Sequence, residues 1–117
     1  MKNIYWAATL LALCLGLWGC GTGRELYSWY NYENASYAFS KKHTEKDEAE
    51  LIKAYEKIID NQSGMRQTVP PGVYAEYGYL LAKSGKVTEG VDLMQKEIDT
   101  YPESRVFIDR IIKQFKR

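Results

Sequence analysis

Apolar positions recur at three- and four-residue intervals along most of the chain. The clearest stripe follows a Thr44-Glu45-Lys46-Asp47 start, which is typical of a helix N-terminus, and consists of Leu51, Ile52, Tyr55, Ile58 and Ile59. Similar spacing predicts helices over residues 27–41, 45–61, 71–84, 87–100 and 103–116. The breaker-rich segment 61–72, Gly85 and Pro102 separate them, and Pro71 is expected in a first helical turn. The pattern therefore predicts an all-α domain over residues 26–117.

Aromatic side chains are concentrated in the first predicted helix. Ser28, Tyr32, Ala35 and Phe39 follow the spacing of one helical face, whereas Tyr30 and Tyr37 lie off it. Two interpretations remain open. Either a neighbouring helix covers the remaining aromatics, or the surface around Trp29 and Tyr30 is a contact surface for another protein.

A different pattern occupies the N-terminus, where Lys2 precedes an uncharged apolar run from Ile4 to Trp18. A membrane-spanning helix needs about 20 apolar residues, and this run is shorter and meets glycines at its end. Its length and flanks are typical of the apolar region of a secretory signal peptide.

The end of this run, Leu17-Trp18-Gly19-Cys20, resembles the lipobox of bacterial lipoproteins, from which Trp18 departs by its size. The resemblance implies a signal peptide over residues 1–19, lipid such as palmitate on Cys20, and a tether over residues 20–25. Gly21, being non-acidic, implies sorting to the outer membrane of a Gram-negative cell. An ordinary secretory signal and a short uncleaved anchor are the alternatives.

Composition narrows the function classes. The chain has 117 residues, 45% of them hydrophobic and 26% charged, which predicts one globular domain. A net charge of +1 gives no electrostatic case for nucleic acid. Both cysteines, Cys14 and Cys20, precede the predicted domain, so no disulfide framework is expected within it.

The sequence shows no motif typical of a catalytic site. His43 is the single histidine and follows two lysines in a polar connector, where a solvated position is the simpler interpretation. The acidic residues around position 47 suit a first helical turn better than a cation site. The sequence therefore predicts a non-enzymatic protein without metal or cofactor.

Residues 71–104 resemble one tetratricopeptide repeat. The matching positions are Tyr74, Tyr77, Gly78, Leu81, Gly85, Gly90, Met94 and Pro102, while Glu97 and the size of Tyr77 depart from the pattern. Residues 26–62 are similar to a longer, degenerate copy, and the last helix would cap the stack. The resemblance implies a tetratricopeptide-like stack of antiparallel hairpins, with a groove helix that exposes Glu76, Tyr79 and Lys83 as candidate protein-binding residues.

The lipobox, the Trp29-Tyr30 start and the segments 69–72 and 74–78 together resemble a family of small bacterial outer-membrane lipoproteins. Its members are encoded beside a lipoprotein similar to the curli secretion channel. The resemblance implies a periplasm-facing interaction module or accessory subunit of an outer-membrane assembly, with a curli-secretion-channel-like lipoprotein as a possible partner. The alternative is a structural lipoprotein that forms a permanent oligomer through its aromatic surface.

Overall fold

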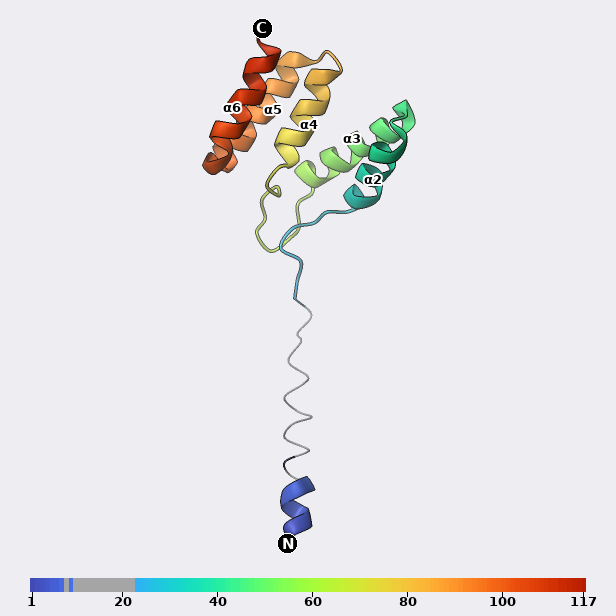
Figure 1. Ribbon diagram of the computed structural model, residues 1–117, viewed down its shortest axis with the longest axis vertical. Helices are drawn as coiled ribbons and strands as arrows, with labels where there is room; N and C mark the ends of the chain where they lie inside the picture. The colour runs from blue at the N-terminus through green and yellow to red at the C-terminus, as the bar shows by residue number, and fades with distance from the viewer. Residues whose placement is uncertain (8, 10–22) are drawn as a thin grey trace.

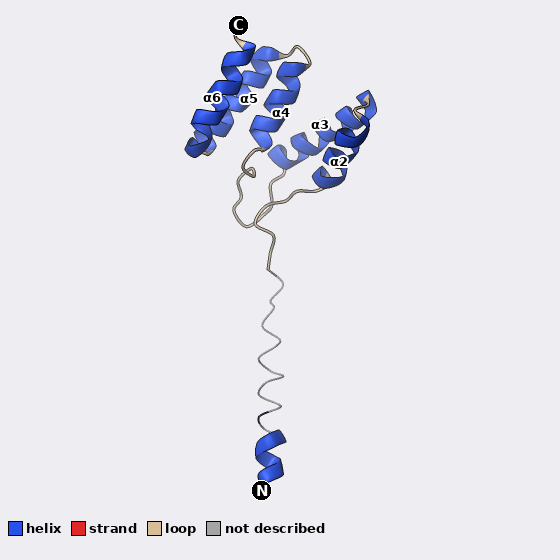
Figure 2. Ribbon diagram, in the orientation of Figure 1, coloured by secondary structure: helices blue, strands red, loops and turns tan. Residues whose placement is uncertain are grey.

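The computed structural model describes residues 1–7, 9 and 23–117, and these residues are helical or irregular, without a strand (Figures 1 and 2). Residues 2–7 are helical at the N-terminus. The domain contains α2 (Tyr32–Lys42), α3 (Glu45–Asp60), α4 (Val73–Lys83), α5 (Val87–Thr100) and α6 (Arg105–Phe115), with a 3₁₀ turn (Pro102–Ser104) before α6. The predicted all-α stack with a C-terminal helix is confirmed.

Two antiparallel hairpins and the final helix follow one another in space (Figure 1). Helices α2 and α3 form the first hairpin, α4 and α5 the second, and α6 packs against α5. Helix α3 begins as predicted, because Thr44 Oγ1 accepts a hydrogen bond from the Asp47 N–H at 3.1 Å. The tight turn at Gly85, which has a φ of 98°, reverses the chain between α4 and α5.

The first predicted helix begins five residues too early, and Ser28 therefore does not share a helical face with Tyr32. Residues 25–28 instead pair with the 61–72 loop, where the Met65 N–H donates to the Glu25 carbonyl at 3.0 Å. The side chain of Gln62 also accepts from the Ser28 N–H and donates to the Ser28 carbonyl. These contacts hold residues 25–28 against the loop in a non-helical conformation, and α2 starts only after Tyr30, which has a φ of 50°.

Two smaller boundary corrections concern prolines. Pro71 lies in the turn before Gly72, the N-cap of α4, and not in the first turn of the helix. Pro102 opens a 3₁₀ turn, so α6 begins at Arg105 rather than at residue 103. Both prolines mark the approach to a helix, where a missing backbone N–H costs no hydrogen bond.

The hydrophobic core has two parts that meet along α4. The first lies between the α2–α3 hairpin and the start of α4 and consists of Ala35, Leu51, Ala54, Tyr55, Ile58, Val69 and Val73. The second lies among α4, α5 and α6 and consists of Ala82, Met94, Ile98, Ile108 and Ile112. Helix α4 therefore contributes to both cores, and its remaining face is free to line a site.

Glu97 is buried on α5, with 2% of its surface exposed. Its Oε1 accepts the Gly72 N–H at 2.7 Å, so this carboxylate satisfies a backbone donor at the N-terminus of α4. Its Oε2 has no hydrogen-bond partner among the described residues. Glu97, which departs from the repeat pattern, thus joins α5 to the start of α4.

Several predictions fall on the N-terminal segment. Cys20, most of the predicted signal peptide and the first residues of the tether lie outside the described residues, so the structure says nothing about them. Among the described residues, no helix is long and apolar enough to cross a membrane.

Candidate functional site

A groove of about 550 Å³ lies between the α2–α3 hairpin and α4. In Figure 1 the two groups of helices approach each other at the start of α4 and diverge toward its end. The walls come from α2, from α3 and from one face of α4, and the lining residues include Ser36, Phe39, Ser40, His43, Glu48, Leu51, Tyr55, Glu76, Tyr79, Leu80 and Lys83. Polar and apolar groups therefore share the same concave surface.

All three residues predicted for the groove helix line this groove. Glu76, Tyr79 and Lys83 are spaced by three and four residues on α4, which places them on one face of the helix. That face is the one left after Gly78 and Leu81 turn into the core. The structure thus brings the predicted set together with residues of α2 and α3.

One end of the groove is fixed by a carboxylate and two tyrosines. Glu76 Oε2 accepts hydrogen bonds from the Tyr32 hydroxyl at 2.6 Å and from the Tyr55 hydroxyl at 3.0 Å. Burial, reinforced by the negative charge of Glu76, raises the pKa of the Tyr55 hydroxyl. Burial and the bond to Glu76 raise the pKa of Tyr32 as well. Both phenols therefore stay protonated and keep Glu76 in place as a fixed acceptor.

The other two predicted residues extend along α4 from this end. The Tyr79 ring meets the Phe115 ring of α6 edge-on, with 5.7 Å between centroids, and 42% of Tyr79 remains exposed. Lys83 Nζ lies 5.7 Å from the centre of the Tyr79 ring and forms no ion pair with any described residue. Tyr79 is thus partly held by α6, while Lys83 leaves a cation available at the groove.

The second candidate surface, around Trp29 and Tyr30, is partly occupied by contacts within the chain. Trp29 packs against Tyr32 at 5.3 Å between ring centroids. The Tyr30 hydroxyl donates to the Asn61 carbonyl, and Lys57 Nζ lies 4.7 Å from the centre of its ring. Trp29 and Tyr30 do not line the groove. Among the aromatics of this region, Tyr37 is the most exposed, at 67%.

Sequence reasoning missed the contribution of the first hairpin to the groove. His43 lines the groove, and its ring lies 5.1 Å from that of Phe39. It takes a left-handed conformation at the end of α2, and its N–H donates to the Phe39 carbonyl at 2.9 Å. No local signal could place His43 opposite α4, because that neighbour is separated from it by the whole of α3 and the following loop.

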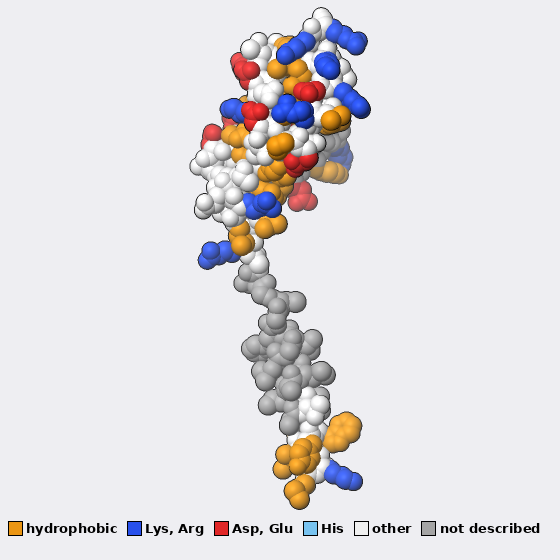
Figure 3. All heavy atoms as spheres, turned by 90° about the vertical axis from the view of Figure 1, so that its left-hand side faces the viewer, with side chains coloured by type: hydrophobic (Ala, Val, Ile, Leu, Met, Phe, Trp, Pro, Cys, Tyr) orange, Lys and Arg blue, Asp and Glu red, His pale blue; other side chains and the backbone are white. Residues whose placement is uncertain are grey.

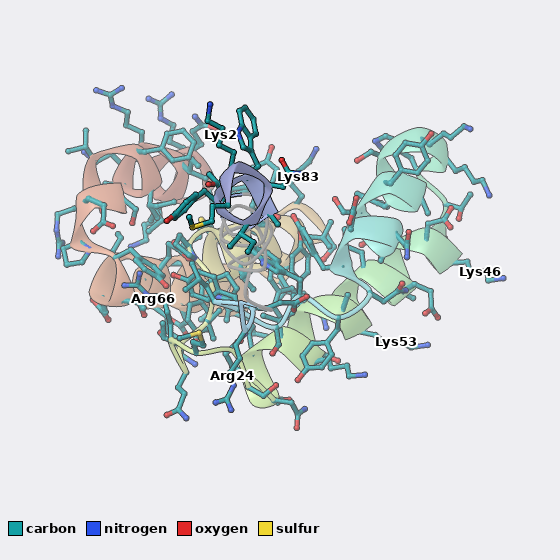
Figure 4. The ribbon with its side chains drawn as sticks, turned by 90° about the horizontal axis from the view of Figure 1, so that it is seen from below. Lys2, Arg24, Lys46, Lys53, Arg66 and Lys83 are labelled. Atoms are coloured by element: carbon teal, nitrogen blue, oxygen red, sulfur yellow. The ribbon has the colours of Figure 1, made fainter. Side chains whose placement is uncertain are left out.

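The acidic start of α3 lies at a capped helix N-terminus, where Thr44 accepts from the Asp47 N–H. Glu45, Asp47 and Glu48 lie in the first turn. In the described part of the chain, no group of three or more His, Cys, Asp or Glu residues is placed to hold a metal ion. Figure 4 shows Lys46 and Lys53 pointing outward from α3, and Lys53 pairs with Glu50 at 2.8 Å.

Comparison with known protein families identifies a family that matches this chain. A family model described as a domain of unknown function, DUF4810, matches residues 26–111. The chain belongs to the DUF4810 family. The matched residues of this DUF4810 domain include α2 to α5, the whole groove and most of α6. No curated protein and no solved structure matches the chain.

Proposed function

We propose that this DUF4810 protein is a non-enzymatic interaction module that binds a segment of another cell-envelope protein in the groove between the α2–α3 hairpin and α4. The observation that carries the proposal is the convergence of Glu76, Tyr79 and Lys83 with apolar residues of the first hairpin on one concave surface. Concave surfaces that combine apolar side chains with a few polar groups are the usual form of a binding site.

The chemistry of the groove supports a polypeptide partner. Phe39 and Leu80 offer apolar contacts, while Glu76 and Lys83 offer a fixed acceptor and a cation that a peptide backbone or side chain can meet. The resemblance of residues 71–104 to a tetratricopeptide repeat adds support, because such stacks bind partners on the concave side.

We also propose that the protein is an outer-membrane lipoprotein that faces the periplasm, with a lipid-modified Cys20 as its anchor. The support is the apolar run that ends in Leu17-Trp18-Gly19-Cys20. A curli-secretion-channel-like lipoprotein is the partner that the sequence resemblance suggests. Together these features describe an accessory subunit of an outer-membrane assembly.

The alternative, a permanent oligomer through the aromatic surface, has less support. Trp29 and Tyr30 are engaged by Tyr32, Lys57 and Asn61 of the same chain. Tyr37 alone is left as a largely exposed aromatic of α2.

The anchor is tested by Cys20→Ser in the full chain. We expect an unlipidated precursor that leaves the outer-membrane fraction, because the acyl chains would hold a protein of this size at the bilayer. Mass spectrometry and membrane fractionation measure both effects. Unchanged mass and fractionation would contradict the anchor.

The groove is tested by site-specific photo-cross-linking in living cells. A photoreactive amino acid replaces Ser40, which is exposed at the edge of the groove, or Lys46, which points outward from α3. We expect a discrete heterologous product from position 40 alone. Lys83→Glu should abolish that product, since it reverses the free cation, whereas Lys53→Glu on the outer face should leave it.

The same experiment can reject the proposal. Equal products from positions 40 and 46, or products from position 40 that survive Lys83→Glu at unchanged protein stability, would exclude the groove as the binding site. A product whose mass is that of two copies of this chain would favour the oligomer.

A further inference from the structure

The outward face of α6 combines exposed apolar and basic side chains. Helix α6 buries Ile108 and Ile112 against the second core. On the opposite side, 67% of Val106 and 66% of Phe107 are exposed. Two large neighbouring apolar residues at this exposure are an unusual feature of a solvated helix face and indicate a contact surface.

Basic residues continue the same face toward the C-terminus. Arg110 and Lys113 follow Val106 and Phe107 at three- and four-residue intervals, so they lie on the same side of the helix, and Lys116 and Arg117 follow directly after its end. Residues 105–117 contain five basic residues and one acidic residue, Asp109, although the whole chain has a net charge of only +1. Asp109 is half-buried, away from the centre of this face.

These cations are free to meet an external anion. None of them forms an ion pair with another described residue. Figure 3, which looks onto this side of the molecule, shows Lys and Arg side chains over its upper part, interspersed with Asp and Glu and with apolar side chains. The face is a convex helix surface and does not border the groove.

We propose that the outward face of α6 lies on the surface of an anionic phospholipid bilayer. Phe107 and Val106 would enter the interface between headgroups and acyl chains, while the cations meet the lipid phosphates. A convex face on which basic side chains lie beside exposed apolar ones suits an extended, planar polyanion better than a peptide, which needs a groove. The choice of a bilayer over a soluble polyanion rests on the membrane attachment proposed above, since an anchored domain meets lipid at high effective concentration.

The experiment follows the environment of α6 in the full chain. Cys14→Ser and Cys20→Ser remove the native thiols, and Gln114→Cys on the outward face carries an environment-sensitive fluorophore. The matched control carries the same fluorophore at Lys46→Cys, on the far side of the first hairpin. The protein is mixed with vesicles of phosphatidylcholine alone or of phosphatidylcholine and phosphatidylglycerol in equal parts.

We expect a blue shift and quenching by a lipid-borne quencher at position 114, with phosphatidylglycerol vesicles only, and loss of both at high salt. The variant Phe107→Ser, Arg110→Gln, Lys113→Gln should lose the signal at unchanged helix content, because all three residues are exposed. The label at position 46 should not respond.

Three outcomes would overturn the inference. They are an unchanged label at position 114 with anionic vesicles, an equal response with neutral vesicles, and a response to soluble polyglutamate that vesicles do not produce. Fractionation of the chain with and without Cys20, as described above, reports on the proposed attachment independently of α6. A failure of α6 is therefore distinguishable from a failure of the proposed attachment.

Discussion

The two faces of α4 make helix contacts of opposite kinds. Toward α5, Gly78 and Gly90 face each other so closely that a Cβ atom on Gly78 would lie 2.5 Å from the Gly90 carbonyl oxygen. Toward α3, the contact is made by large rings: Tyr55 of α3 stacks on Tyr77 of α4 with 5.5 Å between centroids, and Tyr32 of α2 packs against Tyr55 at 5.6 Å within the first hairpin. Small residues let the α4–α5 backbones meet, while tyrosines hold α3 and α4 apart.

This difference explains where the groove lies. A helix pair that meets through glycines has no space for a ligand, because backbone atoms fill the interface. A pair separated by aromatic side chains leaves room beyond the last ring, and here that room is lined by Phe39, Leu80 and Lys83. The α4–α5 contact gives rigidity and the α3–α4 contact gives a site, so each can be disturbed separately.

The largest effect is expected from Gly78→Leu at the close contact. The new side chain would collide with the Gly90 carbonyl and with Met94 and Leu93, so we expect the free energy of unfolding to fall by about 1–3 kcal/mol or more through overpacking. Urea denaturation followed by circular dichroism measures the change. Ala49→Leu, which adds the same side chain on the exposed face of α3, is the matched control. Equal stability of the two variants would contradict a glycine-dependent contact.

A substitution at Glu97 is expected to lower the free energy of unfolding by less than Gly78→Leu does. Glu97→Ala removes the acceptor of the part-buried Gly72 N–H and leaves this donor without its protein partner, which should cost about 1–3 kcal/mol. Glu97→Gln keeps an oxygen acceptor at the same position and should retain more of the stability in urea denaturation. If the alanine variant were as stable as the glutamine variant, the hydrogen bond would not be what holds α5 to the start of α4.

These two residues also show how far the sequence could lead. Gly78 was predictable as a close contact, because helical spacing places it beside Leu81 on the inward side and the repeat pattern requires a small residue there. The burial of Glu97 was not predictable, because its partner is a backbone N–H distant in sequence and a charged residue is normally exposed. The α4 half of the groove followed from the resemblance to a tetratricopeptide repeat together with the spacing of residues on one helix. The α2 and α3 half, with His43 and Phe39, depended on how two hairpins meet, which local spacing does not encode.

The start of α2 illustrates the same limit. The aromatic spacing from Ser28 onward is compatible with a helix, and isolated helical preference would extend α2 to residue 27. Instead, backbone groups of residues 25–28 form hydrogen bonds with the 61–72 loop. Tertiary hydrogen bonds thus override a local preference of small magnitude.

The smallest effect is expected at the α3–α4 contact at alkaline pH. Burial, together with the hydrogen bond to Glu56 at 3.1 Å, raises the pKa of the Tyr77 hydroxyl to about 12. An unfolded tyrosine has a pKa near 10, so the folded state favours the neutral phenol. The stability that this group contributes is fully present below about pH 10 and is lost as the pH rises through about 12. We therefore expect the urea midpoint of the wild-type chain to fall across this interval.

The urea midpoint of Tyr77→Phe should fall less steeply with pH, because one of the groups that deprotonate on unfolding is gone. Tyr37→Phe, which removes a hydroxyl from an exposed residue, is the control and should follow the wild type. Identical slopes for Tyr77→Phe and Tyr37→Phe would mean that the Tyr77 hydroxyl does not help to hold α3 and α4 in their splayed arrangement.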